Sequence, residues 1–351
     1  MFRIVKTLAK QTKFGKYLKD LKRIKRIAES ESYFPEKPRK SYCQRVNDLL
    51  RWRRKWGEVH NFYNVYGQDC IGANLEEYLD YRVGYMGTRD RMNALDKTWN
   101  MSCLFEDKFL FDRMMRSVGA PTPKVFGFIQ NGQVYDPDLN SISIDDLADR
   151  KDFFLKDAYG ICGNLVKHVA DYQSFTDLFA SLPKDGAYVL QERVCQCAEE
   201  NRLFPGSVNT VRLITARRRN GETYLFAKLQ RIGSSISNNV DNWAAGGIAV
   251  GIEDSGCLKR WGFFKYMYGR KTETHPDTGV RFAEFKVPKL DEAIKLVVSL
   301  HRYFYNLCSI GWDVALTENG PVIIEGNENW DMALAQVCDR PLRKEYLSLS
   351  K

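Results

Sequence analysis

The sequence predicts an α+β protein whose first hundred residues are basic and mainly helical. Apolar residues recur at helical intervals in residues 1–30 and 290–307, which predicts amphipathic helices there. Short apolar runs separated by turn signals predict strands from residue 125 onward, and helices and strands do not alternate strictly as in a parallel α/β sheet. At 351 residues, with 44% hydrophobic and 28% charged residues, the chain suits two or three globular domains.

Several classes of protein are disfavoured. No run approaches the roughly 20 apolar residues needed to cross a bilayer, and the N-terminus lacks the apolar core of a secretory signal. The 9 cysteines include no C-x-x-C pair and the 4 histidines are scattered, so we expect reduced thiols rather than disulfides or a zinc site. No G-x-x-x-x-G-K-[ST] motif occurs, which disfavours P-loop enzymes. These features predict a cytoplasmic protein.

Positive charge is concentrated at the N-terminus. Residues 1–60 hold 18 Lys and Arg against 6 Asp and Glu, a balance of +12, whereas the whole chain carries +9. With apolar residues at helical spacing, Met1–Ser30 is predicted to be a basic amphipathic helix. Such a helix either lies on an anionic membrane surface or packs against the body with its basic face in water. Nucleic acid is disfavoured because no ribonucleoprotein or helix-turn-helix pattern accompanies it.

A predicted hairpin near the C-terminus places three oxygen-bearing side chains on one face. Its strands flank Glu318-Asn319-Gly320, which fits a three-residue loop with glycine in the left-handed position. This loop pairs Asp313 with Glu325 and puts Asn327 on the same face, whereas a two-residue loop would separate the carboxylates. Convergent carboxylate and amide oxygens suit Mg²⁺. The alternative is a solvated face with unrelated acids, but apolar neighbours indicate a buried hairpin and favour the metal.

A second predicted hairpin carries two arginines. Its strands flank Asn220-Gly221, a two-residue turn signal, and this register places Arg212 and Arg231 diagonally on one face. Neighbouring guanidinium groups need an anion, which is either a phosphate or a nearby Asp or Glu. The Gly- and Asn-rich loop 234–247 follows, and its length and glycines suit a lid over a polyphosphate.

Lys156 ends a predicted strand directly before Tyr159-Gly160-Ile161-Cys162-Gly163. A lysine in this position can reach phosphates that the loop covers. The alternative is a buried lysine paired with an Asp.

Several short strings between about residues 104 and 340 occur in a characteristic order. They are Asp107-Lys108, GAPTPKVF, YVLQERV, NTVRLIT, KLQRIG, NNVDNWAAGGIAVGI, HPDTGVRF, GWDVALTENGPVIIEGN and NWDMALAQ. Together they resemble the ATP-grasp superfamily, and specifically its sugar-transfer-associated family, which is linked to cell-surface polysaccharide assembly. The resemblance implies a two-lobed α+β fold with ATP between lobes 104–187 and 188–345, preceded by the basic helical region 1–103.

The resemblance also implies site residues, which match the family position by position. They are Lys108 and Lys156 for the nucleotide phosphates, Gln191, Glu192 and Val194 for adenine, Glu199 for the ribose, Arg212 and Arg231 for the γ-phosphate and an acyl phosphate, and Asp313, Glu325 and Asn327 for two Mg²⁺ ions. His275 and Asp277 belong to a string of the narrower family, and no role is assigned to them.

The implied activity is that of an ATP-dependent, ADP-forming ligase, which joins a carboxylate to an amine through an acyl phosphate. The expected substrates are small molecules or glycans, such as an amino acid and a sugar carboxylate. We also expect no nucleic acid partner and a peripheral contact of residues 1–30 with an anionic membrane. A kinase that phosphorylates a sugar or lipid hydroxyl is the alternative, and a non-catalytic relic that recruits partners is a third.

Overall fold

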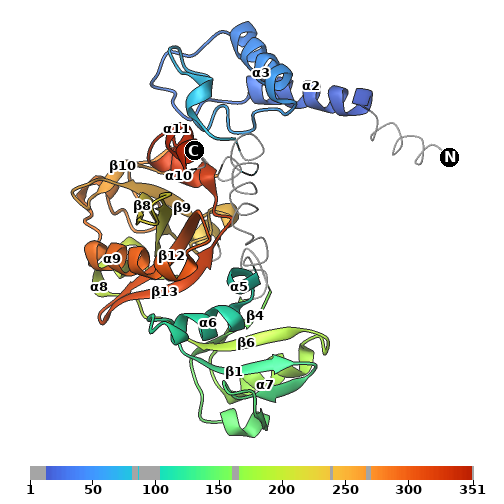
Figure 1. Cartoon of the computed structure of the whole chain (residues 1–351), viewed down its shortest axis with the longest axis vertical. Helices are drawn as coiled ribbons and strands as arrows, with labels where there is room; N and C mark the ends of the chain where they lie inside the picture. Colours follow the sequence, from blue (N-terminus) through green and yellow to red (C-terminus); the bar gives the residue numbers. More distant parts are fainter. Residues whose placement is uncertain are drawn as a thin grey trace, which may run out of the picture. The chain divides into compact units, whose positions relative to one another are not determined.

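The structure, a computed structural model, describes residues 13–80, 86, 103–159, 166–237, 240–265 and 270–349. The chain divides into two compact units, one of Met1–Arg91 with Asp331–Lys351 and one of Met92–Trp330 (Figure 1). Residues 331–345, which the sequence analysis assigned to a second lobe, are thus grouped with the N-terminal region, and the predicted lobe boundaries remain predictions. Over the described residues, every helix is too short or too polar to cross a membrane.

Where it is described, the first unit consists of helices joined by turns. It contains α2 (Lys13–Glu29), α3 (Tyr42–Trp56), η1 (Leu75–Glu77), α10 (Met332–Cys338) and α11 (Arg343–Ser348). The apolar face of α2, formed by Ile24, Ile27 and Ala28, is buried with Leu49 of α3. The predicted basic helix therefore packs its apolar side against a neighbouring helix. Its first twelve residues lie outside the described part of the chain.

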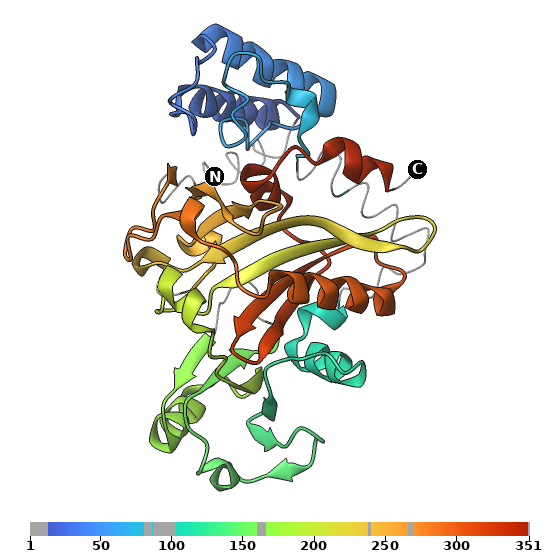
Figure 2. The ribbon, with the colours of Figure 1, turned by 90° about the vertical axis from the view of Figure 1, so that its left-hand side faces the viewer.

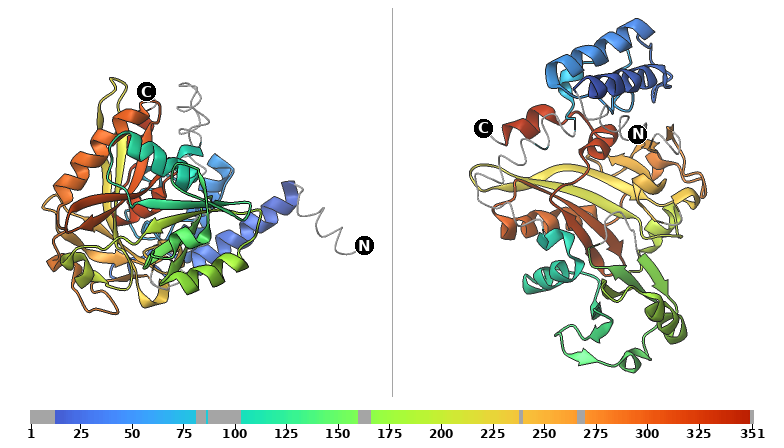
Figure 3. Two further views of the ribbon diagram at one scale, coloured as in Figure 1. Left: turned by 90° about the horizontal axis from the view of Figure 1, so that it is seen from below. Right: turned by 90° about the vertical axis from the view of Figure 1, so that its right-hand side faces the viewer.

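The second unit contains two antiparallel sheets with helices beside them (Figures 2 and 3). The first sheet has six strands in the order β3-β2-β1-β6-β4-β5. Its strands are β1 (Val125–Gln130), β2 (Gln133–Tyr135), β3 (Ser141–Ile142), β4 (Phe153–Asp157), β5 (Val166–Val169) and β6 (Ala187–Glu192). The helices of this part are α5 (Cys103–Glu106), α6 (Lys108–Ser117), η2 (Ile144–Leu147) and α7 (Tyr172–Ser181). Phe175 of α7 is buried in the core of this sheet with Phe153.

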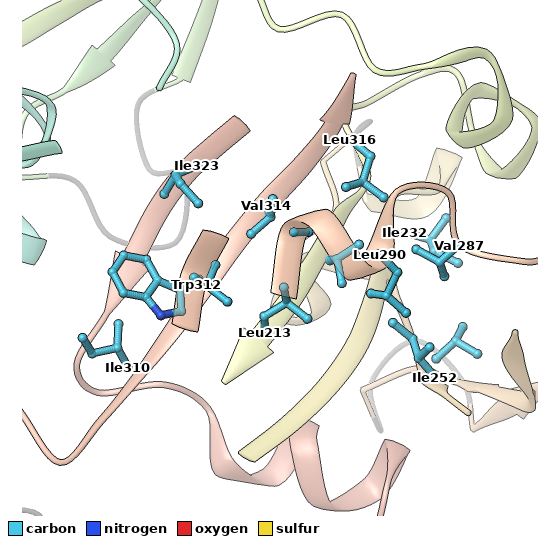
Figure 4. Close-up of a cluster of buried hydrophobic side chains, with 14 of the residues drawn as sticks. Leu213, Ile232, Ile252, Val287, Leu290, Ile310, Trp312, Val314, Leu316 and Ile323 are labelled. Carbon is cyan, nitrogen blue, oxygen red and sulfur yellow. The ribbon is translucent and has the colours of Figure 1, made fainter. Parts of the chain in front are cut away.

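The second sheet has seven strands in the order β11-β10-β9-β8-β7-β12-β13. Its strands are β7 (Thr210–Arg217), β8 (Thr223–Ile232), β9 (Ile248–Ile252), β10 (Leu258–Phe263), β11 (Lys271–Thr272), β12 (Ser309–Thr317) and β13 (Gly320–Asn327). The helices that accompany it are α8 (Ala198–Leu203), η3 (Ser235–Ser237), η4 (Trp243–Ala245), η5 (Phe282–Glu284), α9 (Leu290–His301) and η6 (Arg302–Phe304). Leu290 of α9, Trp312 and Val314 share one buried cluster (Figure 4). Because side chains alternate along a strand, Asp313 between Trp312 and Val314 faces the other side of the sheet.

The hairpin β12–β13 differs from its predicted loop but keeps the predicted pairing. Thr317 pairs with Gly320, so the loop has two residues rather than three. A β-bulge between Val314 and Asp313 then adds one residue on β13, and Asp313 pairs with Glu325. The bulge lets Ile323 stay in the core while Glu325, two residues later, reaches the other face. The predicted loop was therefore wrong, and the bulge restores the register at the site.

The hairpin β7–β8 shows the same compensation, with a bulge that again adds one residue on the second strand. Arg218 pairs with Glu222 around a three-residue loop that ends at Gly221, whose φ is 86°, so the predicted two-residue turn was wrong. A bulge between Thr215 and Ile214 corrects the register. Beyond the bulge, Arg212 pairs with Leu229 and Thr210 with Arg231, as predicted.

Candidate functional site

Charged side chains form a row across four adjacent strands of the seven-stranded sheet. Arg212 on β7 pairs with Asp313 on β12, which in turn pairs with Glu325 on β13. Arg231 on β8 lies diagonal to Arg212. Along each strand these charged residues alternate with core residues. Their two positive and two acidic side chains therefore meet on the face of the sheet away from the core.

Asp313 binds both arginines. Arg212 donates to it from Nε and, at 2.8 Å, from Nη2, and Arg231 Nη1 donates to Oδ2 at 2.5 Å. Burial opposes the charged form, but the two guanidinium groups outweigh it and hold the pKa of the Asp313 carboxyl well below its usual value. The sequence predicted either a phosphate or an acidic side chain as the anion beside the arginines, and the structure shows an acidic side chain, Asp313.

Glu325 and Asp313 are joined by a hydrogen bond between their carboxyl groups. Burial, together with the charge of Asp313, raises the pKa of Glu325 to about 7. Asn327 donates from Nδ2 to Glu325 Oε1 at 3.1 Å. The structure therefore brings together the three side chains predicted to bind Mg²⁺.

This group of oxygens fits a divalent cation. Opposed carboxylates repel each other unless a proton or a cation lies between them, and the raised pKa of Glu325 reflects this repulsion together with burial. Asp313, Glu325 and Asn327 would hold the ion through carboxylate and amide oxygens, which are the ligands that Mg²⁺ prefers. Within the described ranges no three His, Cys, Asp or Glu side chains are arranged to bind a metal. A cation at this place thus depends on the amide of Asn327.

Two lysines from the other part of the unit lie within electrostatic range of Glu325. Lys108 begins α6, directly after Asp107, which accepts hydrogen bonds from Phe109 N and Leu110 N. Burial lowers the pKa of Lys108, and the charge of Glu325 opposes this shift. Burial also lowers the pKa of Lys156 on β4 to about 8; the charge of Glu325 again opposes the shift, and that of Lys108 adds to it. The two lysines therefore lie near each other and near the acids.

In the described part of the chain, Gln191 is the one predicted adenine or ribose residue with a hydrogen bond to either lysine. Gln191 on β6 is buried and accepts a hydrogen bond from Lys156 Nζ at 2.6 Å. Glu192 is exposed, and its Oε1 accepts from Lys124 N at 2.7 Å. Val194 is half-buried beyond the end of β6, and Glu199 is exposed in the first turn of α8. Over the described residues, no hydrogen bond joins these three to the charged row or the lysines. Gly160–Gly163, the predicted phosphate loop, lies outside the described residues.

Sequence reasoning missed one acidic residue of the site. Asp241 accepts a hydrogen bond from Arg231 Nη2 at 3.0 Å and another from the Thr210 hydroxyl. Its signal in the sequence is weak, since it is one acid in the Gly- and Asn-rich loop 234–247. The feature that could have indicated it is Arg231, which needs an anion and lies three residues before this loop.

The model of the family described as sugar-transfer-associated ATP-grasp matches residues 142–347, more than half of the chain. The chain therefore belongs to the sugar-transfer-associated ATP-grasp family. The predicted fold class, an α+β ATP-grasp fold after a basic, mainly helical region, is confirmed.

Solved structures of similar fold are remote in sequence. D-alanine–D-alanine ligase from Bacillus anthracis is 14% identical, with a TM-score of 0.38, 70% of this chain covered and 65% of that one. The ADP complex of purK, an N5-carboxyaminoimidazole ribonucleotide synthetase, is 15% identical, with a TM-score of 0.42 and coverage of 73% and 52%. The corresponding synthetase from Thermotoga maritima is 13% identical, with a TM-score of 0.38 and coverage of 72% and 49%. The chain thus spans between half and two thirds of the length of these proteins. No curated protein sequence matches it.

Proposed function

We propose that the protein is an ATP-dependent, ADP-forming ligase that joins a carboxylate to an amine. One observation carries the proposal: Asp313 and Glu325 oppose each other on a face that also holds Arg212 and Arg231. Acids that can bind a cation, beside guanidinium groups that can bind a phosphate, are what a triphosphate substrate requires. Membership of an ATP-grasp family supports the choice of ATP.

The proposed reaction makes a poor acyl donor reactive. A carboxylate oxygen of the substrate attacks the γ-phosphorus of ATP, the bond from that phosphorus to the bridging oxygen breaks, and ADP leaves. The amine nitrogen then attacks the carbonyl carbon of the acyl phosphate, the bond from carbon to the phosphorylated oxygen breaks, and phosphate leaves as the nitrogen loses a proton. When bound, Mg²⁺ supplies charge neutralisation for the phosphates.

The chain's own residues are proposed to hold the reactants and balance their charge. Lys108 and Lys156 would contact the phosphates, with Lys156 fixed by its hydrogen bond to Gln191. Arg212 and Arg231 would bind the phosphoryl group as it is transferred, since charge that develops on its oxygens is stabilised by preorganised donors. Glu192, Val194 and Glu199 are proposed to contact the nucleoside.

The family description favours a sugar carboxylate as the acyl donor and an amino acid or another amine as the acceptor, in cell-surface polysaccharide biosynthesis. A screen that reads ADP formation, with amino acids and amines tested against uronic-acid sugars, identifies the pair. No ADP in a broad screen of this kind would contradict an enzymatic function and favour the non-catalytic alternative.

A kinase on the same scaffold is the competing function, because it would use the same nucleotide site. A substrate carboxylate labelled with heavy oxygen separates the two activities. A ligase transfers one labelled oxygen into inorganic phosphate, as the bond changes above require. A kinase releases no phosphate, and its product retains the phosphoryl group.

We also propose that the protein acts in the cytoplasm with a peripheral contact at the inner face of an anionic membrane. Lys19, Lys22, Arg23 and Arg26 are exposed on the side of α2 away from its buried face, and no described acidic side chain forms an ion pair with them. Since the apolar side of α2 is buried, the attraction would be electrostatic and sensitive to salt.

Sedimentation with vesicles tests this contact. We expect the protein to bind vesicles of phosphatidylcholine with about 30% phosphatidylglycerol, and not to bind vesicles of pure phosphatidylcholine. Replacing Lys19, Lys22, Arg23 and Arg26 by Glu should abolish binding. The matched control replaces four exposed lysines of the second unit by Glu, namely Lys124, Lys151, Lys167 and Lys184. If both variants lose vesicle binding equally, the effect comes from net charge, and a binding site on α2 is contradicted.

A further inference from the structure

Arg231 is held from two sides by two carboxylates on different segments. Its Nη1 donates to Asp313 on β12 at 2.5 Å, and its Nη2 donates to Asp241 of loop 234–247 at 3.0 Å. We propose that Asp241 is a positioning residue, which fixes the Arg231 guanidinium in the orientation that reads the γ-phosphate. This inference rests on the proposed function, since it assigns a role within the same nucleotide site.

The Asp241 carboxylate is itself fixed at both oxygens. Oδ1 accepts from Arg231, and Oδ2 accepts from the hydroxyl of Thr210, which pairs with Arg231 across β7 and β8. Its side chain is only 15% exposed. A carboxylate held by both members of one cross-strand pair cannot rotate without losing a hydrogen bond. The guanidinium that it binds through Nη2 is therefore restrained in its position.

The segment that follows Asp241 is anchored to the sheet. Trp243 is buried and donates from its indole nitrogen to Phe263 O at 2.9 Å. Ser234 Oγ donates to Gly246 O at 3.1 Å, which ties the start of the loop to its end. Gly247 packs so closely that a Cβ there would lie 2.8 Å from Asp241 O. These contacts support Asp241 from its own loop, and the role of loop 234–247 as a lid stays a prediction.

The turn that contains His275 and Asp277 anchors the other flank of the loop. His275 is buried, and its Nδ1 accepts from Asp277 N and Thr278 N, so its proton lies on Nε2 and is donated to Gly233 O at 2.8 Å. Asp277 accepts from Ser235 N at 2.9 Å and from Ser235 Oγ at 2.5 Å. This turn holds the chain directly after Arg231, which gives the otherwise unassigned His-Pro-Asp-Thr-Gly string a structural role in the same support.

The test compares binding of a non-hydrolysable ATP analogue with binding of ADP, because only the analogue presents a γ-phosphate. With Mg²⁺ present, Asp241→Asn keeps the shape but removes the charge, and we expect it to reduce the preference for the analogue about tenfold, the effect of one charge-assisted hydrogen bond. Asp241→Glu should recover part of the preference. ADP affinity and the unfolding midpoint should change little, whereas a merely structural role would lower both.

Asp254 provides the matched control. It pairs with Lys228 of the same strand β8 at 3.0 Å, but its side chain is fully exposed, so Asp254→Asn should leave the preference unchanged. In an Arg231→Met background, Asp241→Asn should have no further effect, because Asp241 acts through Arg231. If Asp241→Asn does not fold, Thr210→Val, which releases only Oδ2, should give a smaller loss in the same direction.

The outcomes separate this inference from the proposed function. If the wild-type protein prefers the analogue and Asp241→Asn behaves as Asp254→Asn does, the role of Asp241 is wrong and the nucleotide site stands. If Asp241→Asn still lowers the preference in the Arg231→Met background, Asp241 does not act through Arg231. If the wild-type protein binds neither nucleotide, the proposed function and this inference are both wrong.

Discussion

The carboxyl groups of Asp313 and Glu325 share a hydrogen bond across β12 and β13, while both neighbouring arginines bind on the Asp313 side. The pair is therefore unequal. Asp313 stays ionised, and Glu325, whose pKa burial raises to about 7, can exchange its proton for a cation near neutral pH.

Removing one carboxylate of this pair should abolish activity without unfolding the protein. We expect Glu325→Ala to lower the rate of ADP formation by about two orders of magnitude or more, because a ligand for the cation is lost. Its unfolding midpoint should stay close to that of the wild type, since Asp313 keeps both arginines. Glu284→Ala, at an exposed glutamate of the same unit, is the control. Near-normal turnover of Glu325→Ala would rule out the metal assignment.

Lys156 should make nucleotide binding depend on pH. Since burial lowers its pKa to about 8, its side chain is mostly charged at pH 7 and mostly neutral at pH 9. Affinity for ADP without metal, measured by calorimetry, should therefore fall as the pH rises through 8. Lys156→Met should bind weakly at both values, while Lys124→Met, at an exposed lysine, should follow the wild type. An unchanged pH dependence in Lys156→Met would exclude Lys156 as a phosphate contact.

A buried acid–amide pair predicts a second pH effect, on stability. Gln230 Nε2 donates to Glu200 Oε2 at 3.0 Å, and within the described ranges no partner is found for Oε1 of either residue. A proton on Glu200 removes the buried charge and supplies a hydrogen-bond donor, and burial raises the pKa of this carboxyl to about 8. The folded state thus retains a proton that the unfolded state loses near pH 4.5, so the stability contribution of this group falls between pH 4.5 and 8.

Glu200→Gln should remove the loss of stability between pH 4.5 and 8, because glutamine places a neutral donor and acceptor where the carboxyl group was. We expect the variant to be more stable than the wild type at pH 8, by several kcal/mol at most, and about equal to it at pH 5. Urea unfolding at the two values measures the difference. A variant that is equally stable or less stable at pH 8 would show that Glu200 is ionised in the folded protein.

Gln336 should be essential to the first unit. Its Oε1 accepts from Leu79 N at 2.8 Å and from Leu342 N at 3.2 Å, and its Nε2 donates to Leu79 O and to the Tyr66 hydroxyl, each at 3.0 Å. Gln336→Ala leaves these buried groups unsatisfied, so we expect a loss of about 3 kcal/mol or more in the free energy of unfolding. Gln173→Ala, at an exposed position of α7, should change it by less than about 0.5 kcal/mol. Equal stability of the two variants would contradict the role of Gln336.

The sequence was sufficient for those parts of the fold that depend on local pattern. Alternation along strands predicts which side chains share a face, whereas the pairing of Asp313 with Glu325 and the diagonal of Arg212 and Arg231 agree with prediction because a bulge offsets each loop length. Both loop lengths were wrong, since each hairpin contains a bulge that changes the register by one residue. A bulge is set by packing, here the need to bury Ile323 and still present Glu325 on the opposite face, and no local signal marks it.

Contacts between distant segments could not be predicted from local pattern. Asp241 lies in a loop without regular periodicity, and its role is visible only once Thr210 and Arg231 are placed side by side. Gln336 likewise reads as a polar residue on a short helix, although it is buried against residues more than 250 positions earlier.

The bond between Gln336 and Leu79 also constrains the order in which the chain can mature during synthesis. These residues are 257 positions apart, and the whole of the second unit lies between them. Residues 92–330 are complete in sequence before the last partners of the first unit are added, so the inserted unit can fold without them while the amino-terminal helices wait. A released chain that ends at residue 330 should therefore protect the inserted unit from protease and leave the leading segment open to cleavage.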